Sequence, residues 1–177
     1  IFNLDKISYA SDLTSIERII KNLEEEDKQR YFFLKCDLAD FSLTEQCLSK
    51  SNPDIVFHLA AESHVDRSIS SPANFIQSNI NGTYHLLQAT KKHYHSISIK
   101  RKENFRFHHI STDEVFGSLD ENGFFNEDSP YDPRSPYSAS KASSDHLVKA
   151  WFHTFGLPVI TTNCSNNYGP WQFPEKF

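Results

Sequence analysis

The sequence predicts an α/β fold, in which helices pack on both faces of a parallel, doubly wound sheet. Short apolar runs typical of buried strands alternate along the 177 residues with segments whose apolar side chains recur at helical spacing. Helical links between neighbouring strands make those strands parallel, which is the second indication of this fold. Hydrophobic residues form 38% and charged residues 23% of the chain, as expected for a globular domain with its own core.

The first part of the chain predicts three strands separated by two helices. Residues 1–5 form the end of a buried strand that finishes on a carboxylate, and residues 31–36 form a second, short strand. A helix that begins at a serine or aspartate cap and carries an apolar stripe is expected over residues 11–26. A shorter helix is expected over residues 42–51. The apolar run at residues 54–59 predicts a strand buried on both sides.

The second part continues the same alternation. A long helix fits residues 72–94, and a strand fits residues 104–110. Residues 113–135 are rich in Asp, Pro and Gly and predict a loop. A Ser-Pro dipeptide is a favourable start for the helix expected to run to residue 155, and the glycine that follows is a favourable end. Residues 157–163 predict the last strand.

Charge and hydropathy exclude several classes of function. The formal net charge is −5 and the basic residues are scattered, so no nucleic-acid partner is expected. Since no apolar run approaches the roughly 18–20 residues of a membrane helix, no membrane partner is expected either. Three widely spaced cysteines favour free thiols in a reducing compartment, which predicts a cytoplasmic protein. The nine histidines lack metal-ligand spacing, so no metal is expected.

Polar residues follow each predicted strand. They are Asp5 with its neighbour lysine, Asp37, residues 62–64, residues 111–114 and residues 163–167. The carboxyl ends of parallel strands meet at one edge of the sheet, and ligands of doubly wound folds bind at that edge. Five polar clusters at a single edge exceed what folding requires, so we expect the binding site there.

A dinucleotide-binding fold also needs a glycine-rich turn after its first strand. The chain has five glycines, none so spaced, and no methionine. We therefore expect residues 1–177 to be a partial NAD-binding, Rossmann-like domain whose first strand and glycine turn precede Ile1. In the usual strand order, the absent strand lies between the segments that end at Asp5 and Leu59. The isolated chain is then expected to fold poorly and to be inactive.

Tyr137 and Lys141 predict an alcohol-oxidising site. Four residues apart on a helix, they share one face, and an ammonium near a phenol lowers its pKa. Thr112, at the end of the preceding strand, can hydrogen-bond the same substrate hydroxyl, so three groups converge on one oxygen. The Tyr-x-x-x-Lys pattern by itself is common. The alternative without a catalytic role is a half-buried tyrosine beside an exposed lysine.

Asp113 and Glu114 predict an elimination step. When a hexose is oxidised at C4, its C5 hydrogen becomes acidic and its C6 hydroxyl can leave. A base must take the C5 proton and an acid must protonate the C6 oxygen, which two carboxyls with separated pKa values can do. We assign Glu114 as the base and Asp113 as the acid. The alternative for an isolated Asp-Glu pair is a structural role, in which the two residues only cap a turn.

Four longer segments carry a resemblance to a known family. Residues 59–68, 109–115, 135–145 and 162–170 resemble dTDP-glucose 4,6-dehydratase, an extended short-chain dehydrogenase. The resemblance is collinear over nearly the whole chain. It implies NAD as the cofactor, a 4-dehydro-6-deoxy sugar nucleotide as the product, and a homodimer in the complete enzyme. It also implies that the chain ends where the nucleotide-sugar-binding region begins.

The resemblance assigns site residues individually. It implies catalytic roles for Thr112, Asp113, Glu114, Tyr137 and Lys141. It implies substrate contacts for Ser63, Thr112, Asn166 and Lys176. The residues that it implies for the cofactor are Asp5, Lys6, Ile7, Ser8, Asp37, Leu38, Leu59, Ala60, Ala61, Glu62, Ser63, Ser78, Tyr137, Lys141 and Asn167.

Three alternatives stay open. A nucleotide-sugar 4-epimerase would share Tyr137 and Lys141 but would not need the adjacent carboxyl pair. A dehydratase could act on a GDP- or UDP-sugar instead of dTDP-glucose. The chain could also be an inactive fragment that only binds a nucleotide sugar.

Overall fold

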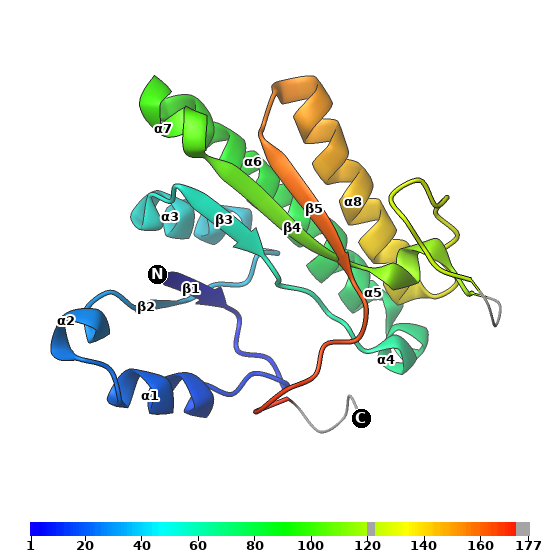
Figure 1. The fold of residues 1–177 in the computed structure, drawn as a ribbon, viewed down its shortest axis with the longest axis horizontal. Helices are drawn as coiled ribbons and strands as arrows, with labels where there is room; N and C mark the ends of the chain where they lie inside the picture. The colour runs from blue at the N-terminus through cyan, green and yellow to red at the C-terminus, as the bar shows by residue number, and fades with distance from the viewer. Residues whose placement is uncertain (120–122, 173–177) are drawn as a thin grey trace.

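The computed structural model describes residues 1–119 and 123–172, and its described strands are all parallel (Figure 1). Strand β1 (Phe2–Asp5) pairs with β2 (Phe32–Lys35). Strand β4 (Arg106–Thr112) lies between β3 (Ile55–His58) and β5 (Val159–Cys164). The predicted α/β fold with parallel pairing is confirmed. Among the described strands, however, the hydrogen bonds form two separate sheets rather than one.

A cavity of about 730 Å³ lies between the two sheets, lined by both β1 and β3. The prediction that the third strand is buried on both sides is therefore wrong. Ile55 is 50% exposed and Phe57 is 61% exposed. The reason is that, among the described strands, β3 pairs with β4 alone and turns its other side to the cavity.

The predicted helix over residues 11–26 is wrong in its extent. It consists of α1 (Thr14–Lys21) and a short α2 (Glu25–Lys28). Glu24 has extended backbone angles (φ −64°, ψ 152°), so the helix is interrupted there. Asp12 accepts hydrogen bonds from Thr14 at 2.6 and 2.8 Å, but the residue in the cap position is Leu13.

Of the next helices, α3 precedes β3 in the sequence and the others follow it. Helix α3 (Phe41–Ser51) matches its prediction, whereas α4 (Val65–Ser70) was not predicted. The long helix expected over residues 72–94 comprises α5 (Pro72–Phe75), the π-helical η1 (Ile76–Asn81) and α6 (Gly82–Ser96). A π-helical turn widens the helix locally and often accompanies a functional site.

The last elements match their predicted bounds best where residues close in sequence determine where an element begins or ends. Helix α7 (Ile99–Asn104) was missed, so β4 begins two residues later than predicted. The short η2 (Asp113–Phe116) follows β4. Helix α8 (Pro136–Phe155) opens with a reciprocal capping box between Ser135 and Ser138, and it ends at Gly156 with φ +66°.

The hydrophobic core lies on the three-stranded side. Helices α6 and α8 pack against each other, α8 packs on β4 and β5, and α3 packs on α6 (Figure 1). Each fully buried large side chain contributes roughly 1.5–3 kcal/mol. The buried cluster consists of Leu48, Leu86, Leu87, Ala89, Ile97, Phe105, Phe107, Val148, Trp151 and Leu157.

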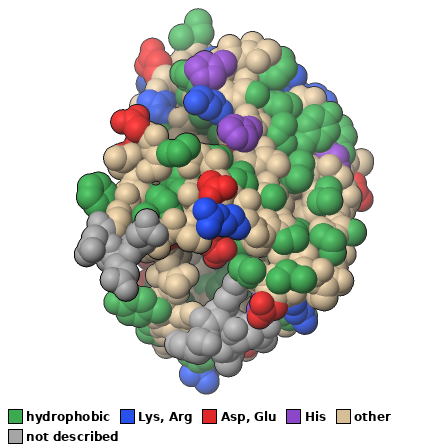
Figure 2. Space-filling view, turned by 90° about the vertical axis from the view of Figure 1, so that its right-hand side faces the viewer, with side chains coloured by type: hydrophobic (Ala, Val, Ile, Leu, Met, Phe, Trp, Pro, Cys, Tyr) green, Lys and Arg blue, Asp and Glu red, His purple; other side chains and the backbone are tan. Residues whose placement is uncertain are grey.

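The surface is mixed in character. On the face drawn in Figure 2, acidic and basic side chains lie interspersed among hydrophobic and polar ones. Each helix within the described ranges is too short or too polar to cross a lipid bilayer.

Candidate functional site

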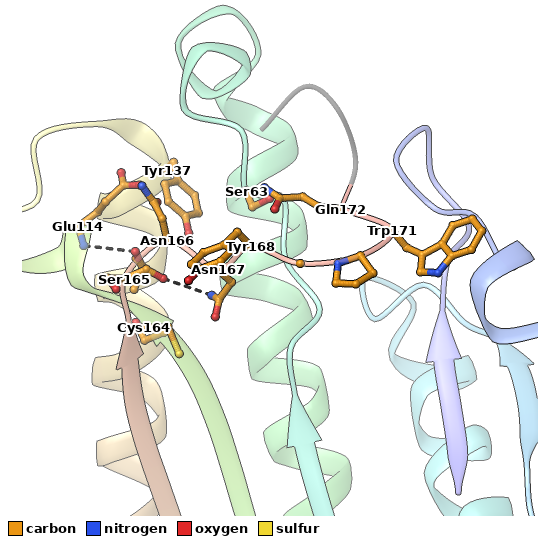
Figure 3. A pocket seen from close by; sticks show the side chains of 14 residues that line it. Ser63, Glu114, Tyr137, Cys164, Ser165, Asn166, Asn167, Tyr168, Trp171 and Gln172 are labelled. Carbon is orange, nitrogen blue, oxygen red and sulfur yellow. Dashed lines mark hydrogen bonds between the residues drawn. The ribbon is translucent and has the colours of Figure 1, made fainter. Parts of the chain in front are cut away.

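A cavity of about 630 Å³ opens where β4, β5 and α8 meet (Figure 3). Figure 3 shows Glu114, Tyr137 and Asn166 at one end of this cavity and Trp171 at the other. Residues far apart in the sequence therefore share one wall, as expected at the carboxyl edge of a parallel sheet. The lining residues are Ser63, Ser111, Thr112, Glu114, Tyr137, Cys164, Ser165, Asn166, Asn167, Tyr168, Gly169, Pro170, Trp171 and Gln172.

The end of β4 positions the predicted acid and base. The Thr112 side-chain oxygen accepts a hydrogen bond from the Glu114 backbone N–H at 3.2 Å and donates one to Asp113 Oδ1 at 3.3 Å. Thr112 thereby caps η2 and fixes the start of the turn. Glu114 lines the cavity, while Asp113 is half-buried and lies beyond the lining set, one hydroxyl away through Thr112.

Tyr137 lines the cavity from the first turn of α8 and is 8% exposed. Burial raises the pKa of its phenol to about 12, a hydrogen bond with Thr112 lowers the pKa, and the charges of Glu114 and Asp113 raise it. The expected lowering of this pKa by Lys141 is not found, because Lys141 is not among the groups that shift it, and burial has the largest effect.

Lys141 lies one turn further along α8 and is 5% exposed. Its Nζ donates a hydrogen bond to the Ile110 carbonyl at 2.8 Å, which ties α8 to β4. Burial lowers the pKa of Lys141 to about 8, and the charge of Asp145 opposes that shift. Lys141 thus lies behind Tyr137, outside the lining set of the cavity.

A second cavity, of about 220 Å³, lies at the ends of β1, β2 and β3. Its wall combines two carboxylates, Asp5 and Asp37, with small and apolar side chains. Asp5 Oδ1 accepts hydrogen bonds from the Ile7 N–H at 2.6 Å and from Ser11 Oγ at 2.9 Å. The lining residues are Leu4, Asp5, Lys6, Ser8, Ala10, Ser11, Cys36, Asp37, Leu38, Leu59, Ala60, Ala61 and Ser78.

Three residues predicted for the cofactor meet although they lie on different segments. Lys6 Nζ donates to Glu62 Oε1 at 2.8 Å and to Ser78 Oγ at 3.2 Å. This cluster joins the end of β1 to the segment after β3 and to η1. Most of the predicted cofactor residues therefore lie around the smaller cavity, whereas Ser63 and Asn167 lie with Tyr137 around the larger one.

The remaining predicted residues lie as follows. Ile7 holds the Asp5 carboxylate through its backbone and has φ +56°, which is rare for a branched residue. Asn167 donates to the Ser165 carbonyl at 3.2 Å (Figure 3), beside Asn166. Lys176 lies outside the described residues.

Asn79 was missed by sequence reasoning. It is 1% exposed in η1, and its side chain both accepts from the Glu62 N–H and donates to the Glu62 carbonyl, at 2.8 and 2.9 Å. It also donates to Ser140 Oγ at 2.8 Å, so it joins the segment after β3 to α8. The only signal in the sequence was an asparagine within a predicted helix, and its burial and pairing are visible only in the structure. The sequence indicated Ser11 or Asp12 as a helix cap, and the contact of Ser11 with Asp5 was likewise missed.

The cysteines are free thiols, with Cys36 and Cys47 buried and Cys164 half-buried. This agrees with the prediction of unpaired thiols. In the described ranges, no three His, Cys, Asp or Glu side chains gather as a metal site would require.

Solved structures similar to this chain are Rossmann-fold, NAD-dependent dehydratases and epimerases. The dTDP-glucose 4,6-dehydratase of Streptomyces venezuelae, solved with NAD bound, is 39% identical with a TM-score of 0.83. The alignment covers 98% of this chain and 48% of that one. The UDP-glucose 4-epimerase of Thermus thermophilus, also in complex with NAD, is 25% identical, with a TM-score of 0.79 over 98% of this chain and 49% of that one.

The chain belongs to the GDP-mannose 4,6 dehydratase family, whose profile matches residues 1–177. The dTDP-glucose 4,6-dehydratase of Neisseria meningitidis serogroup B is 52% identical over 177 residues, which cover 99% of this chain and 48% of that protein. The chain therefore spans about half the length of the curated relatives that it matches. The predicted resemblance is confirmed at the level of the family.

Proposed function

We propose that the complete protein containing residues 1–177 converts dTDP-glucose, with NAD as cofactor, to the 4-dehydro-6-deoxy sugar nucleotide. The observation that carries the proposal is that Thr112, Glu114 and Tyr137 line one cavity. A phenol that can take the proton of a substrate hydroxyl and a separate carboxylate are then within reach of the same substrate. Relatives named dTDP-glucose 4,6-dehydratase support the choice of reaction and substrate.

The smaller cavity suits the adenosine half of NAD. Its apolar wall, which includes Leu38 and Leu59, fits a base, and the fixed Asp5 carboxylate fits a ribose hydroxyl. Lys6, Ile7, Ser8, Asp37, Ala60, Ala61, Glu62 and Ser78 would complete that half, and Ser63, Tyr137, Lys141 and Asn167 would hold the nicotinamide half. When bound there, NAD would supply a reversible hydride acceptor for the oxidation at C4 and the reduction at C6.

Tyr137 takes the proton of the C4 hydroxyl, and Thr112 hydrogen-bonds the same oxygen. Lys141 supplies positive charge behind the phenol, since it lies one helical turn away. The high pKa of Tyr137 in this structure means that the phenolate must be stabilised during the reaction by positive charge close to it. Ser63, Asn166 and Lys176 are proposed to hold the substrate.

The resulting C4 ketone makes the C5 hydrogen acidic. Glu114 removes that proton from within the cavity, and Asp113 protonates the C6 oxygen, which leaves as water. The Thr112 hydroxyl that bonds both residues fixes their relative positions.

The substitution Glu114→Gln tests this assignment in the product of the complete open reading frame. We expect formation of the 4-keto product to fall about 10²–10⁴-fold, because the base is lost, while NAD binding is retained. The matched control is Glu45→Gln, which removes only an exposed ion pair with Lys92. Unchanged elimination in Glu114→Gln would refute the role of Glu114.

A 4-epimerase is the second candidate, because an epimerase also matches the fold over 98% of this chain. Epimerisation at C4 leaves C6 hydroxylated, so a mass decrease equal to one water in the product separates the two reactions. Parallel assays with dTDP-, GDP- and UDP-glucose would identify the nucleobase. An inactive complete protein that still binds the sugar nucleotide would instead favour a binding role.

We further propose a cytoplasmic homodimer. The free thiols support a reducing compartment. The adjacent helices α6 and α8 expose Tyr84, Phe152 and Phe155 at 40%, 48% and 38%, which supports association through this helix pair. Light scattering of the complete protein tests the dimer. We also propose that residues 1–177 alone are inactive, because none of their five glycines has the spacing of the turn that a dinucleotide-binding fold needs.

A further inference from the structure

Asp145 is a buried carboxylate that the proposed reaction does not use. It is 5% exposed and lies on α8 one turn after Lys141. Its Oδ1 accepts from His109 Nε2 at 2.9 Å, and its Oδ2 accepts from Ser111 Oγ at 2.7 Å and Tyr131 OH at 2.9 Å. Three donors from β4 and from the loop before α8 thus converge on one side chain.

The donors place this carboxylate directly behind the site. His109 and Ser111 flank Ile110 on β4, whose carbonyl accepts the hydrogen bond from Lys141. Thr112, the next residue along β4, lines the cavity. Asp145 and Lys141 therefore hold three consecutive residues of β4 between them. Asp145 binds the side chains of His109 and Ser111, and Lys141 binds the backbone carbonyl of Ile110.

The groups around Lys141 indicate that Asp145 supplies the negative charge that acts on the Lys141 ammonium. His58 from β3 and His109 from β4 face Lys141, and burial lowers the pKa of both imidazoles, so they are neutral at neutral pH. Burial lowers the pKa of Lys141, and the negative charge of Asp145 is the largest influence that opposes this lowering. Asp145 is therefore the carboxylate that acts on this ammonium from within the packed elements.

We propose that Asp145 is a positioning residue for the reaction: it keeps Lys141 charged behind Tyr137 and holds the end of β4 at the cavity. This inference rests on the proposed function, since it assigns a role only if Tyr137 and Lys141 act on substrate. A carboxylate that merely filled space would not require three donors, nor a position one turn from the ammonium.

The isosteric substitution Asp145→Asn isolates the charge from the packing. Asparagine keeps the shape and one acceptor oxygen, and its amide can donate to Ser111 or Tyr131, whose hydroxyls can also accept. We expect the folded protein to bind NAD as before. With its counter-charge gone, Lys141 loses its proton at lower pH.

The measurement is kcat against pH in the complete protein. We expect the alkaline limb of the kcat profile to move to lower pH by about one unit in Asp145→Asn. Because the pKa of Lys141 is about 8, kcat at pH 8 should then fall about 5-fold, with KM changed less than about 2-fold. The control Tyr131→Phe removes one donor and leaves the charge, so its alkaline limb should coincide with that of the parent. If kcat of Asp145→Asn falls at the same alkaline pH as that of the parent protein, the proposal is overturned.

Two further outcomes are also decisive. If Asp145→Asn fails to fold, Asp145→Ser supplies a smaller neutral side chain, and failure of both variants makes the role purely structural and overturns the proposal. If the parent protein itself yields no 4-keto product, the proposed function fails. An active parent whose profile is insensitive to Asp145 refutes the positioning role alone.

Discussion

The two sheets of this molecule differ in how they are held. The three-stranded side carries the buried cluster, and Phe105, Phe107 and Leu157 are fully buried there. On the two-stranded side, the described helices α1 and α2 contain no buried residue, and Ile19 is 61% exposed. Figure 1 shows β1, β2 and their helices set apart from the layer of β4, β5, α6 and α8.

The proposed chemistry is divided in the same way. Thr112, Glu114 and Tyr137 belong to the well-packed side, where a reacting group can be held within narrow limits. The smaller cavity lies across both sides, with Asp5 on one and Leu59 on the other. Binding at that cavity therefore depends on a junction fixed by polar contacts such as Lys6 with Glu62, while the catalytic residues depend on the core.

The largest expected difference between the two sides is in how readily each unfolds locally. In a polypeptide of residues 1–177 alone, we expect amides of β1 and β2 to exchange with solvent at least about 100-fold faster than those of β4, because few buried contacts protect them. Hydrogen exchange followed by mass spectrometry measures this. Equal protection on both sides, with tight NAD binding, would contradict the comparison and the expected loss of activity.

A pair of alanine substitutions sharpens the same comparison. Phe107→Ala empties a fully buried site and should lower the free energy of unfolding by about 3–5 kcal/mol. Ile19→Ala, on the exposed face of α1, should change it by less than about 0.5 kcal/mol. Denaturant titration of both variants of the complete protein tests this, and comparable losses would show that α1 is packed.

The smallest effect concerns the helix starts. Ser135→Ala removes the capping box of α8 and should cost about 1 kcal/mol. Asp12→Ala removes the hydrogen bonds to Thr14 ahead of α1, and its effect should be smaller because this helix is solvent-exposed. Thermal melts give both values, and an Asp12 effect as large as that of Ser135 would reverse the ranking.

Local features of the fold could be predicted from the sequence. Helix α8 begins and ends as expected because Ser135, Pro136 and Gly156 act on their own backbone neighbours. The parallel strands and the polar groups at their ends followed from alternation and from chain direction. The extent of the helix over residues 11–26 was mispredicted, because an apolar stripe indicates which face can be buried and carries no information on whether a partner covers it.

The sequence by itself determined which chemical groups are present, the order of the strands and of the longer helices, and the resemblance that identifies the family. Only the tertiary structure decided that Glu114 lines the cavity while Asp113 lies behind Thr112, and that Asn79 and Asp145 join distant segments. The physical reason is range: propensity and capping act within a few residues, whereas burial and pKa depend on which neighbours folding places around a group.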